Sequence, residues 1–426
     1  MNYRYLFEGI ETPVKLKNGL LQIPVNFDNG ATTPPLKSVV KEIMENALTY
    51  GPVARGAGQK GDLCTEKYEK SREKVLDFFN LKQSNTHTVI YTKNTTESLN
   101  LLSNVLIKNK HEKVLTTRME HHANDLPWRN TATVEYVDVD KLGRINIKDI
   151  EAKLIANKGE IKYVSITGAS NVTGYINPIH DIAKICHRHD AKIIVDGAQL
   201  IAHKKIDMKG QNHLEGIDFL VFSGHKAYAP FGSGAIVGLT EELSNINPFL
   251  RGGGCVDTVS DYDVIWDTPS ELHEAGTSNF LGVMAMVRAL ENLQLIGFEK
   301  IYNHEMEIKN YLIRNMKKIE GVNIYGDIEN SEDRLGVITF NVEKIPFDEL
   351  ARIFADKFGI ALRYGKFCAH PYVNRLLGLS DADAYIHSTD EELENFGMVR
   401  LSLGLYNTIE EANLFILALK YIVKKY

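Results

Sequence analysis

The stretch from Ile217 to Gly234, IDFLVFSGHKAYAPFGSG, joins an apolar run to a turn of small residues that contains a lysine. The run IDFLVF predicts a buried strand, and the glycines and proline after it predict a tight turn. Lys226 is therefore expected beside the core, where an ammonium is costly unless it is paired or its pKa is lowered. A lysine with a lowered pKa is a nucleophile. The alternative is an ordinary loop lysine that extends into solvent.

Short runs of the same kind recur through the middle of the chain. They occur at residues 87–92, 113–120, 133–139, 161–171, 192–199, 218–226 and 234–239. These runs are rich in valine and isoleucine and lack strict alternation, which is typical of strands buried on both faces of a mostly parallel sheet. The segments between them, such as residues 176–191, carry helical periodicity. The pattern predicts an α/β fold.

After about residue 285 the pattern changes to long helices followed by a few strands and a closing helix. This order predicts a smaller α+β domain. We expect residues 26–285 to form the large domain, and residues 1–25 together with 286–426 to form the small one. An active site would then lie between the domains, at the carboxyl ends of the parallel strands.

The composition is that of a globular protein, with 426 residues, 44% apolar and 24% charged. The net charge of −6 and the absence of a long basic run argue against nucleic-acid or anionic-membrane partners. The start of the chain has no apolar core of signal-peptide length, and no run approaches the roughly 18 apolar residues of a membrane span. A cytoplasmic location is therefore expected.

The cysteines lie far apart and form no CxxC pair, which argues against a zinc site or a disulfide framework. One or more of them could be a working thiol, and the alternative for each is a small buried hydrophobe. They are Cys64, Cys186, Cys255 and Cys368.

Asp196 ends the β-branched run in IIVDGAQ, at the edge where ligands bind in such sheets, and Gln199 follows it on the turn. A carboxylate there needs a cation, and the protonated ring nitrogen of pyridoxal phosphate would satisfy it. The interval to Lys226 is long enough for a crossover to a neighbouring strand, so the lysine could reach the aldehyde of that ring. The alternative is that Asp196 caps a helix.

Two segments supply groups that suit a phosphate. Ser223 and His225 flank the lysine turn. In the segment NTTE, Thr95 and Thr96 lie where a strand ends and a helix begins, near the positive end of the helix dipole. Every helix start offers the same backbone groups, so this segment by itself does not identify a phosphate site.

Three further candidates follow apolar runs. His121 comes just after a strand and could stack on a cofactor ring and transfer protons near neutral pH, although it could also be a surface or core histidine. In RYGKFCAHP, Cys368 lies between Arg363 and His370, cationic neighbours that favour the thiolate. Arg400, in an apolar run, suits a substrate carboxylate. Together with Lys226, these residues describe an amino-acid site.

The ordered set of motifs resembles one family from nearly end to end. The chain is similar to fold-type I pyridoxal phosphate enzymes of the class V aminotransferase group, and within it to the Suf-type cysteine desulfurases and selenocysteine lyases. The resemblance is carried by FDNGATTPP, NTTESLNLL, MEHHANDLPW, SNVTG, VDGAQ, SGHK, EAGTSN, RYGKFCA and RLSLGLYNT. It implies the same fold, with a large domain built on a mostly parallel sheet and a smaller α+β domain.

The resemblance also implies a role for each matching residue. Lys226 would be the Schiff-base lysine, Asp196 the partner of the pyridine nitrogen, and His121 the residue stacked on the ring. Cys368 would accept sulfur. The other implied contacts are Gln199 to the ring oxygen; Thr95, Thr96, Ser223 and His225 to the phosphate, with Thr277 of a second subunit; and Asn171, Arg363 and Arg400 to the substrate.

The resemblance thus implies a homodimer that converts L-cysteine to L-alanine and passes the sulfur to Cys368 as a persulfide, then to a carrier protein or thiol. Gly30 and Ala54 depart from the family pattern, so substrate and acceptor stay open. One alternative is another class V enzyme, an aminotransferase, C–S lyase or selenocysteine lyase, in which Cys368 is not catalytic. Another is a non-catalytic protein that has kept the fold.

Overall fold

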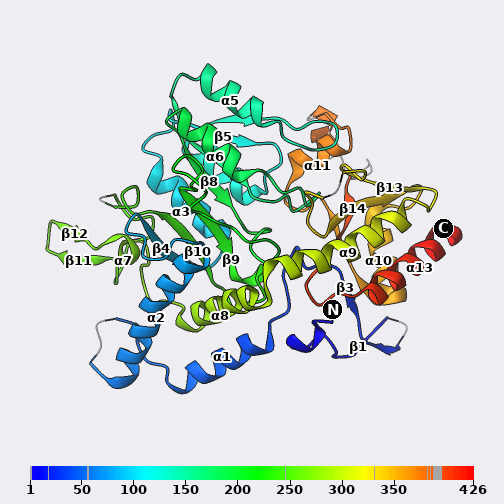
Figure 1. Ribbon diagram of the computed structural model, residues 1–426, viewed down its shortest axis with the longest axis horizontal. Helices are drawn as coiled ribbons and strands as arrows, with labels where there is room; N and C mark the ends of the chain where they lie inside the picture. Colours follow the sequence, from blue (N-terminus) through cyan, green and yellow to red (C-terminus); the bar gives the residue numbers. More distant parts are fainter. Residues whose placement is uncertain are drawn as a thin grey trace.

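A seven-stranded sheet forms the centre of the larger part of the molecule, in the order β4-β10-β9-β8-β7-β5-β6 (Figure 1). The computed structural model describes residues 2–17, 19–54, 57–244, 246–330, 332–380, 382–383, 385–386 and 396–426. Strand β10 runs antiparallel to its neighbours β4 and β9, and the other pairs are parallel. The predicted mostly parallel sheet is confirmed. Its strands are β4 (His87–Thr92), β5 (Lys113–Thr117), β6 (Thr133–Val137), β7 (Ile161–Thr167), β8 (Lys192–Asp196), β9 (Phe219–Ser223) and β10 (Gly234–Leu239).

The central strands β8, β9 and β10 show no alternation of polar and apolar residues because both faces of the sheet are buried there. In β9, Leu220 and Phe222 belong to the core on one face, and Phe219 and Val221 belong to the core on the other. The first face is covered by α1 (Lys37–Leu48), α2 (Gln59–Phe78), α5 (Ile147–Ala156), α6 (Ile179–Arg188) and α8 (Phe280–Ile296). The second is covered by α3 (Thr95–Leu106) and α4 (Leu126–Thr131).

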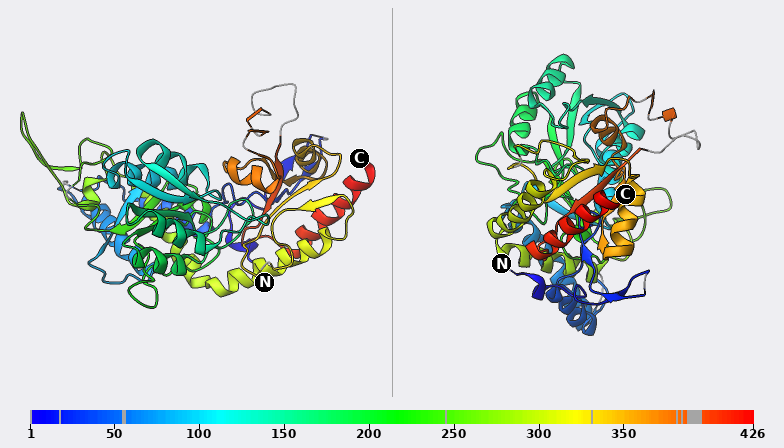
Figure 2. Two further views of the ribbon diagram at one scale, coloured as in Figure 1. Left: turned by 90° about the horizontal axis from the view of Figure 1, so that it is seen from above. Right: turned by 90° about the vertical axis from the view of Figure 1, so that its right-hand side faces the viewer.

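A second, four-stranded antiparallel sheet lies beside the first (Figures 1 and 2), in the order β13-β14-β17-β16. It has its own apolar core, to which its covering helices contribute. The strands are β13 (Val322–Ile324), β14 (Val337–Val342), β16 (Arg363–Gly365) and β17 (Met398–Ser402). The covering helices are α9 (Phe298–Met316), α10 (Phe347–Phe358) and α13 (Ile409–Lys425).

Shorter elements complete the chain. They are η1 (Arg4–Leu6), β1 (Val14–Lys15), β2 (Leu21–Gln22), β3 (Val25–Asn26), η2 (His122–Asn124), η3 (Gly224–Lys226), β11 (Val256–Val259), β12 (Val264–Trp266), α7 (Pro269–Leu272), β15 (Ile360–Ala361) and α11 (His370–Leu376). Strands β11 and β12 form a hairpin at the far end of the larger part (Figure 1).

Near the expected domain boundaries, the chain passes from one apolar core to the other. Val25 and Phe27 belong to the core of the second sheet, and β3 pairs with β15. The side chains of α8 stay in the larger core as far as Leu293, beyond the expected boundary after residue 285. Where the chain divides into domains stays a prediction.

Within the described residues, no single helix has the length and apolar character of a membrane span. One pair, α8 with α9, meets that test by length and composition when taken together, and the two helices are bent by 80° where they meet.

Candidate active site

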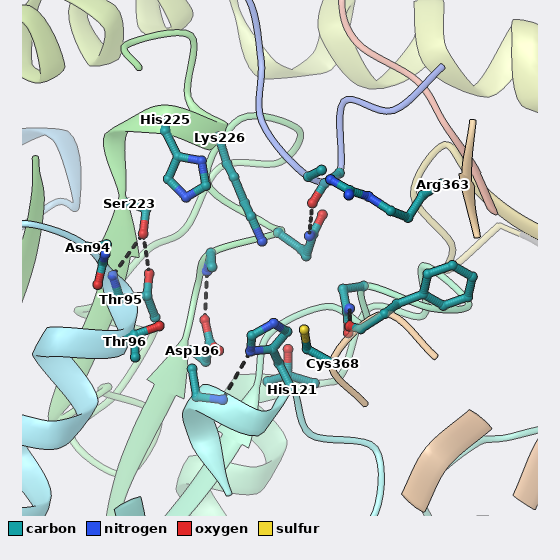
Figure 3. A pocket seen from close by; sticks show the side chains of 18 of the residues that line it. Asn94, Thr95, Thr96, His121, Asp196, Ser223, His225, Lys226, Arg363 and Cys368 are labelled. Carbon is teal, nitrogen blue, oxygen red and sulfur yellow. Dashed lines mark hydrogen bonds between the residues drawn. The ribbon is translucent and has the colours of Figure 1, made fainter. Parts of the chain in front are cut away.

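A cavity of about 560 Å³ opens at the carboxyl ends of the parallel strands, between the two sheets (Figure 3). It brings together every residue that the sequence predicts for the site except Thr277. These residues are Thr95, Thr96, His121, Asn171, Asp196, Gln199, Ser223, His225, Lys226, Arg363, Cys368 and Arg400. What each of them does there stays a prediction.

Lys226 ends the short helix η3, directly after the fully buried strand β9. Gly224 begins η3, and a Cβ there would lie 2.9 Å from Ser233 Oγ and 3.1 Å from the Ser233 carbonyl oxygen, so glycine allows this close approach. Lys226 is half-buried, and its side chain extends into the cavity (Figure 3). Removal from water lowers the pKa of Lys226 to about 8, although the negative charge of Asp196 opposes this shift. An uncharged amine is therefore accessible near neutral pH, as expected for a nucleophile.

Asp196 ends β8, the strand next to β9. Its Oδ1 accepts a hydrogen bond from the Ala198 N–H at 2.9 Å, which closes a local turn, so the carboxylate does not cap a helix. The side chain is buried, and removal from water raises the pKa of the Asp196 carboxyl. Because adjacent parallel strands end at one edge of the sheet, Asp196 and Lys226 reach the same cavity.

The first turn of α3 docks directly on the end of β9. Ser223 Oγ accepts a hydrogen bond from the Thr95 N–H at 2.8 Å and shares another with Thr95 Oγ1 at 2.7 Å. A Cβ on Gly234 would lie 2.8 Å from Asn94 Cα, so glycine allows this close approach. The helix start and the hydroxyls meet at one end of the cavity, which suits an anion.

His121 precedes η2, with its ring half-buried between Asp196 and Cys368 in Figure 3. Its Nδ1 accepts a hydrogen bond from the Ala123 N–H at 3.0 Å, so the neutral ring carries its proton on Nε2. Burial and the nearby charge of Lys226 lower the pKa of His121 to about 3. At neutral pH this ring is uncharged and offers an N–H donor to the cavity. Burial likewise lowers the pKa of His225 to about 4.

Two arginines meet at a carboxylate on the other side of the cavity. Buried Arg400, on β17, donates from Nη2 to Asp28 Oδ1 at 3.2 Å, and exposed Arg363, on β16, pairs with Asp28 at the same distance. Burial lowers the pKa of Arg400 to about 10, opposed by Asp28. Asp28 is a residue that sequence reasoning missed. The quoted motif FDNGATTPP contains it, but no local pattern shows that two distant arginines converge on it.

Asn171 lies between the arginines and the cysteine loop. Its backbone oxygen accepts from Arg400 Nη1 at 2.9 Å, and its Nδ2 donates to the Phe367 carbonyl at 2.8 Å. Its side chain therefore holds the loop that leads to Cys368. The other lining residues that the sequence did not single out include Ala31, Tyr364 and Phe367.

Cys368 is the exposed cysteine, whereas Cys64, Cys186 and Cys255 are buried and free. It lies in the turn between β16 and α11, with its sulfur beside His121 (Figure 3). The hypothesis of a buried structural cysteine therefore fits the other three and not Cys368.

Thr277 lies outside this cavity, on an exposed segment beside Tyr68 and Glu274. The segment is held by Glu274, which pairs with Arg72 at 2.7 Å and accepts a hydrogen bond from the Tyr68 hydroxyl, also at 2.7 Å. Within one chain, Thr277 does not join the site. Its contribution to the site of a second subunit stays a prediction.

Comparison with known proteins shows the family to which most of the chain is similar. A model of the class-V aminotransferase family matches residues 25–415. The probable cysteine desulfurase of Halalkalibacterium halodurans is 34% identical over 91% of this chain and 93% of its own length. That of Staphylococcus aureus is 37% identical over 86% of this chain and 89% of its own.

Solved structures of cysteine desulfurases have the same fold as this chain. A cysteine desulfurase from Thermococcus onnurineus superposes with a TM-score of 0.83 at 30% identity and covers 95% of both chains. A cysteine desulfurase from Escherichia coli superposes with a TM-score of 0.80 at 25% identity, covering 99% of this chain and 98% of that one. With its predicted fold confirmed, this chain belongs to the class-V aminotransferase family, with relatives named as cysteine desulfurases.

Proposed function

We propose that this protein is a pyridoxal phosphate-dependent cysteine desulfurase that converts L-cysteine to L-alanine. The observation that carries the proposal is one cavity lined by a lysine of lowered pKa, a buried carboxylate and an accessible thiol. Relatives named as cysteine desulfurases, alike over most of their length, support it.

The residues present fit the cofactor. Burial raises the pKa of the Asp196 carboxyl. The protonated ring nitrogen would give this carboxylate a cationic partner. The amine of Lys226 would meet the aldehyde, and His121 would lie against the ring. Ser223 and the start of α3 would hold the phosphate. When bound, the cofactor supplies a ring that accepts electrons from the substrate.

The arginines give the site its preference for an amino acid. Arg400 is buried and held by Asp28 and the Asn171 carbonyl, so its guanidinium is fixed before substrate arrives. The Arg400 side chain lines the cavity and carries a guanidinium there. A carboxylate is the natural acceptor for such a group.

Lys226 and Cys368 would carry out the chemistry on the substrate. The uncharged amine of Lys226 removes the proton from Cα of cysteine and later returns a proton. The thiolate of Cys368 attacks the substrate sulfur, so a new S–S bond forms while the substrate Cβ–S bond breaks. The electron pair of the broken bond stays with carbon, which is protonated to give alanine.

Two features of the proposal concern other chains. A homodimer would bring Thr277 of the partner subunit to the phosphate end of the cavity. The exposure of Cys368 would let a carrier protein or a small thiol remove the sulfur. We place the enzyme in the cytoplasm, in keeping with the sequence.

The test is to incubate the purified enzyme with L-cysteine and a reductant and to measure alanine and sulfide together. Wild type is expected to form both in equal amounts, and Cys368→Ala is expected to lose at least about 100-fold in rate, because it lacks the nucleophile. Cys255→Ser, at a buried cysteine, is the matched control and should retain activity. Turnover that survives Cys368→Ala, or no alanine from wild type, would favour another class V aminotransferase or lyase.

A further inference from the structure

We propose that His122, the neighbour of His121, is a positioning residue that holds the turn carrying Cys368 in place. The inference rests on the proposed function, in which Cys368 accepts the sulfur. It assigns His122 a task distinct from that of His121, because the two rings serve different parts of the site.

The turn at Cys368 has an unusual backbone. Phe367 and Cys368 have φ angles of +50° and +54°, in the left-handed region that residues other than glycine seldom adopt. Such a conformation persists only where surrounding contacts hold it. Two contacts come from outside η2: the Ala369 N–H donates to the Lys366 carbonyl at 2.9 Å, and Asn171 Nδ2 donates to the Phe367 carbonyl.

His122 supplies two more contacts on the other side of the turn. Its backbone N–H donates to the Cys368 carbonyl at 2.6 Å. Its Nε2 accepts from the backbone N–H of His370 at 3.3 Å. Because the backbone N–H is the donor, Nε2 must be unprotonated, and the neutral ring carries its proton on Nδ1. The rings of His122 and His370 also lie edge to face, with centroids 4.6 Å apart.

The segment that carries His122 is itself firmly held. Asn124, fully buried in η2, donates from Nδ2 to Glu120 Oε2 at 2.7 Å and accepts from Trp128 Nε1 at 3.1 Å. His121 begins this same segment and faces the cavity. The geometry therefore ties the thiol of Cys368 to the segment that places His121, so the two keep their relative positions.

Four variants separate the parts of this contact. His122→Phe keeps a ring of similar size without the acceptor, and His122→Ala removes the ring entirely. His122→Gln keeps an acceptor close to the position of Nε2. His370→Ala is the matched control, because it removes the ring contact and leaves the backbone donor in place.

The first measurement is hydrogen–deuterium exchange of the peptide that spans residues 366–376, which needs no turnover. Loss of the acceptor is expected to speed exchange in this peptide roughly fivefold in His122→Phe and His122→Ala, the effect of one neutral hydrogen bond. His122→Gln and His370→Ala are expected to stay near wild type. Exchange in β8 and β9 reports whether each variant has kept its fold.

The second measurement is the rate of alanine formation from L-cysteine. A misplaced thiol is expected to lower kcat by roughly tenfold while KM changes less than about twofold, because substrate binding does not use His122. His122→Gln should restore kcat. Unchanged exchange in a folded His122→Phe, or exchange in His370→Ala that is as fast as in His122→Phe, would overturn the proposal. If wild type makes no alanine, the proposed function fails, and the exchange result still decides whether His122 holds the turn.

Discussion

Lys226 and Asp196 line the cavity at positions where burial of their charges destabilises the folded chain. Burial lowers the pKa of Lys226 and raises that of Asp196, so each charged form is destabilised by its surroundings. Among the residues that the structure describes, no carboxylate lies within ion-pairing distance of Lys226 Nζ. Groups so placed are typical of catalytic sites.

The pH dependence of cofactor attachment follows from the pKa of Lys226. Only the uncharged amine reacts with an aldehyde, so the rate of covalent attachment to the apoprotein should rise about tenfold per unit of pH below about 8 and level off above it. Borohydride trapping and mass spectrometry of the Lys226 peptide give this rate. A rate that keeps rising toward pH 10 would mean that the lysine has its ordinary pKa.

Asp196→Asn should have opposite effects on activity and stability. Loss of the carboxylate that would pair with the ring nitrogen is expected to lower kcat by roughly 100-fold. The ligand-free protein should melt at a higher temperature than wild type, because the variant no longer buries a charge. Since the folded-state pKa of Asp196 is raised, this difference should shrink as the pH falls toward and below the ordinary pKa of an aspartate. Thermal unfolding at several pH values checks it, and a lower melting temperature at neutral pH would contradict it.

At the scale of elements, strands β16 and β17 bring two like charges together. Their register places Arg363 directly opposite Arg400, an arrangement that is destabilising unless a carboxylate intervenes. Asp28, in the segment that follows β3, supplies that carboxylate. Arg363, Arg400 and Asp28 therefore form one charged cluster from three distant segments of the chain.

Gly30→Ala should disturb this group more than it disturbs the fold. The new Cβ would lie 3.1 Å from Ser402 Oγ and 3.2 Å from the guanidinium of Arg400, which Asp28 keeps from moving freely. We expect KM for L-cysteine to rise roughly threefold to tenfold, with a smaller change in kcat. Gly216→Ala, where the nearest atoms lie at 3.6 Å, is the control. An unchanged KM would show that Ser402 and Arg400 yield to the new methyl group.

At the scale of the whole molecule, buried polar contacts join the larger core to the second sheet. His203 Nδ1 lies 2.8 Å from Glu305 Oε2 of α9, and Glu305 is fully buried. Arg334, also fully buried, donates from Nε to the Thr173 carbonyl at 2.8 Å. Because the cavity lies between the two sheets, these contacts keep its two sides in place.

Glu305→Ala should destabilise the protein as a whole. The variant leaves buried His203 Nδ1 without its hydrogen-bond acceptor, at a cost of about 2 kcal/mol. The midpoint of urea unfolding should fall, whereas Glu305→Gln, which keeps a hydrogen-bond acceptor, should lose less. Because Glu305 does not line the cavity, kcat of the folded variant should stay within about twofold of wild type. An unchanged midpoint in Glu305→Ala would show that the pair does not stabilise the fold.

Local patterns in the sequence determined much of this protein. The apolar runs predicted the strands of the large sheet, because residues buried on both faces leave a signal within a few positions. The order of motifs predicted the family and the residues of the cavity, from Thr95 to Arg400. Lys226 could be singled out because an ammonium beside a buried strand is conspicuous at that position alone.

Other features were decided only by the tertiary structure. The antiparallel direction of β10, the convergence of Arg363 and Arg400 on Asp28, and the hold of His122 on the Cys368 turn all join segments far apart in the chain. Each depends on a distance or a strand direction, which residue types and spacing do not encode locally. Packing of the two sheets brings these groups within hydrogen-bonding range, and short-range contacts of this kind exist only once the chain has folded.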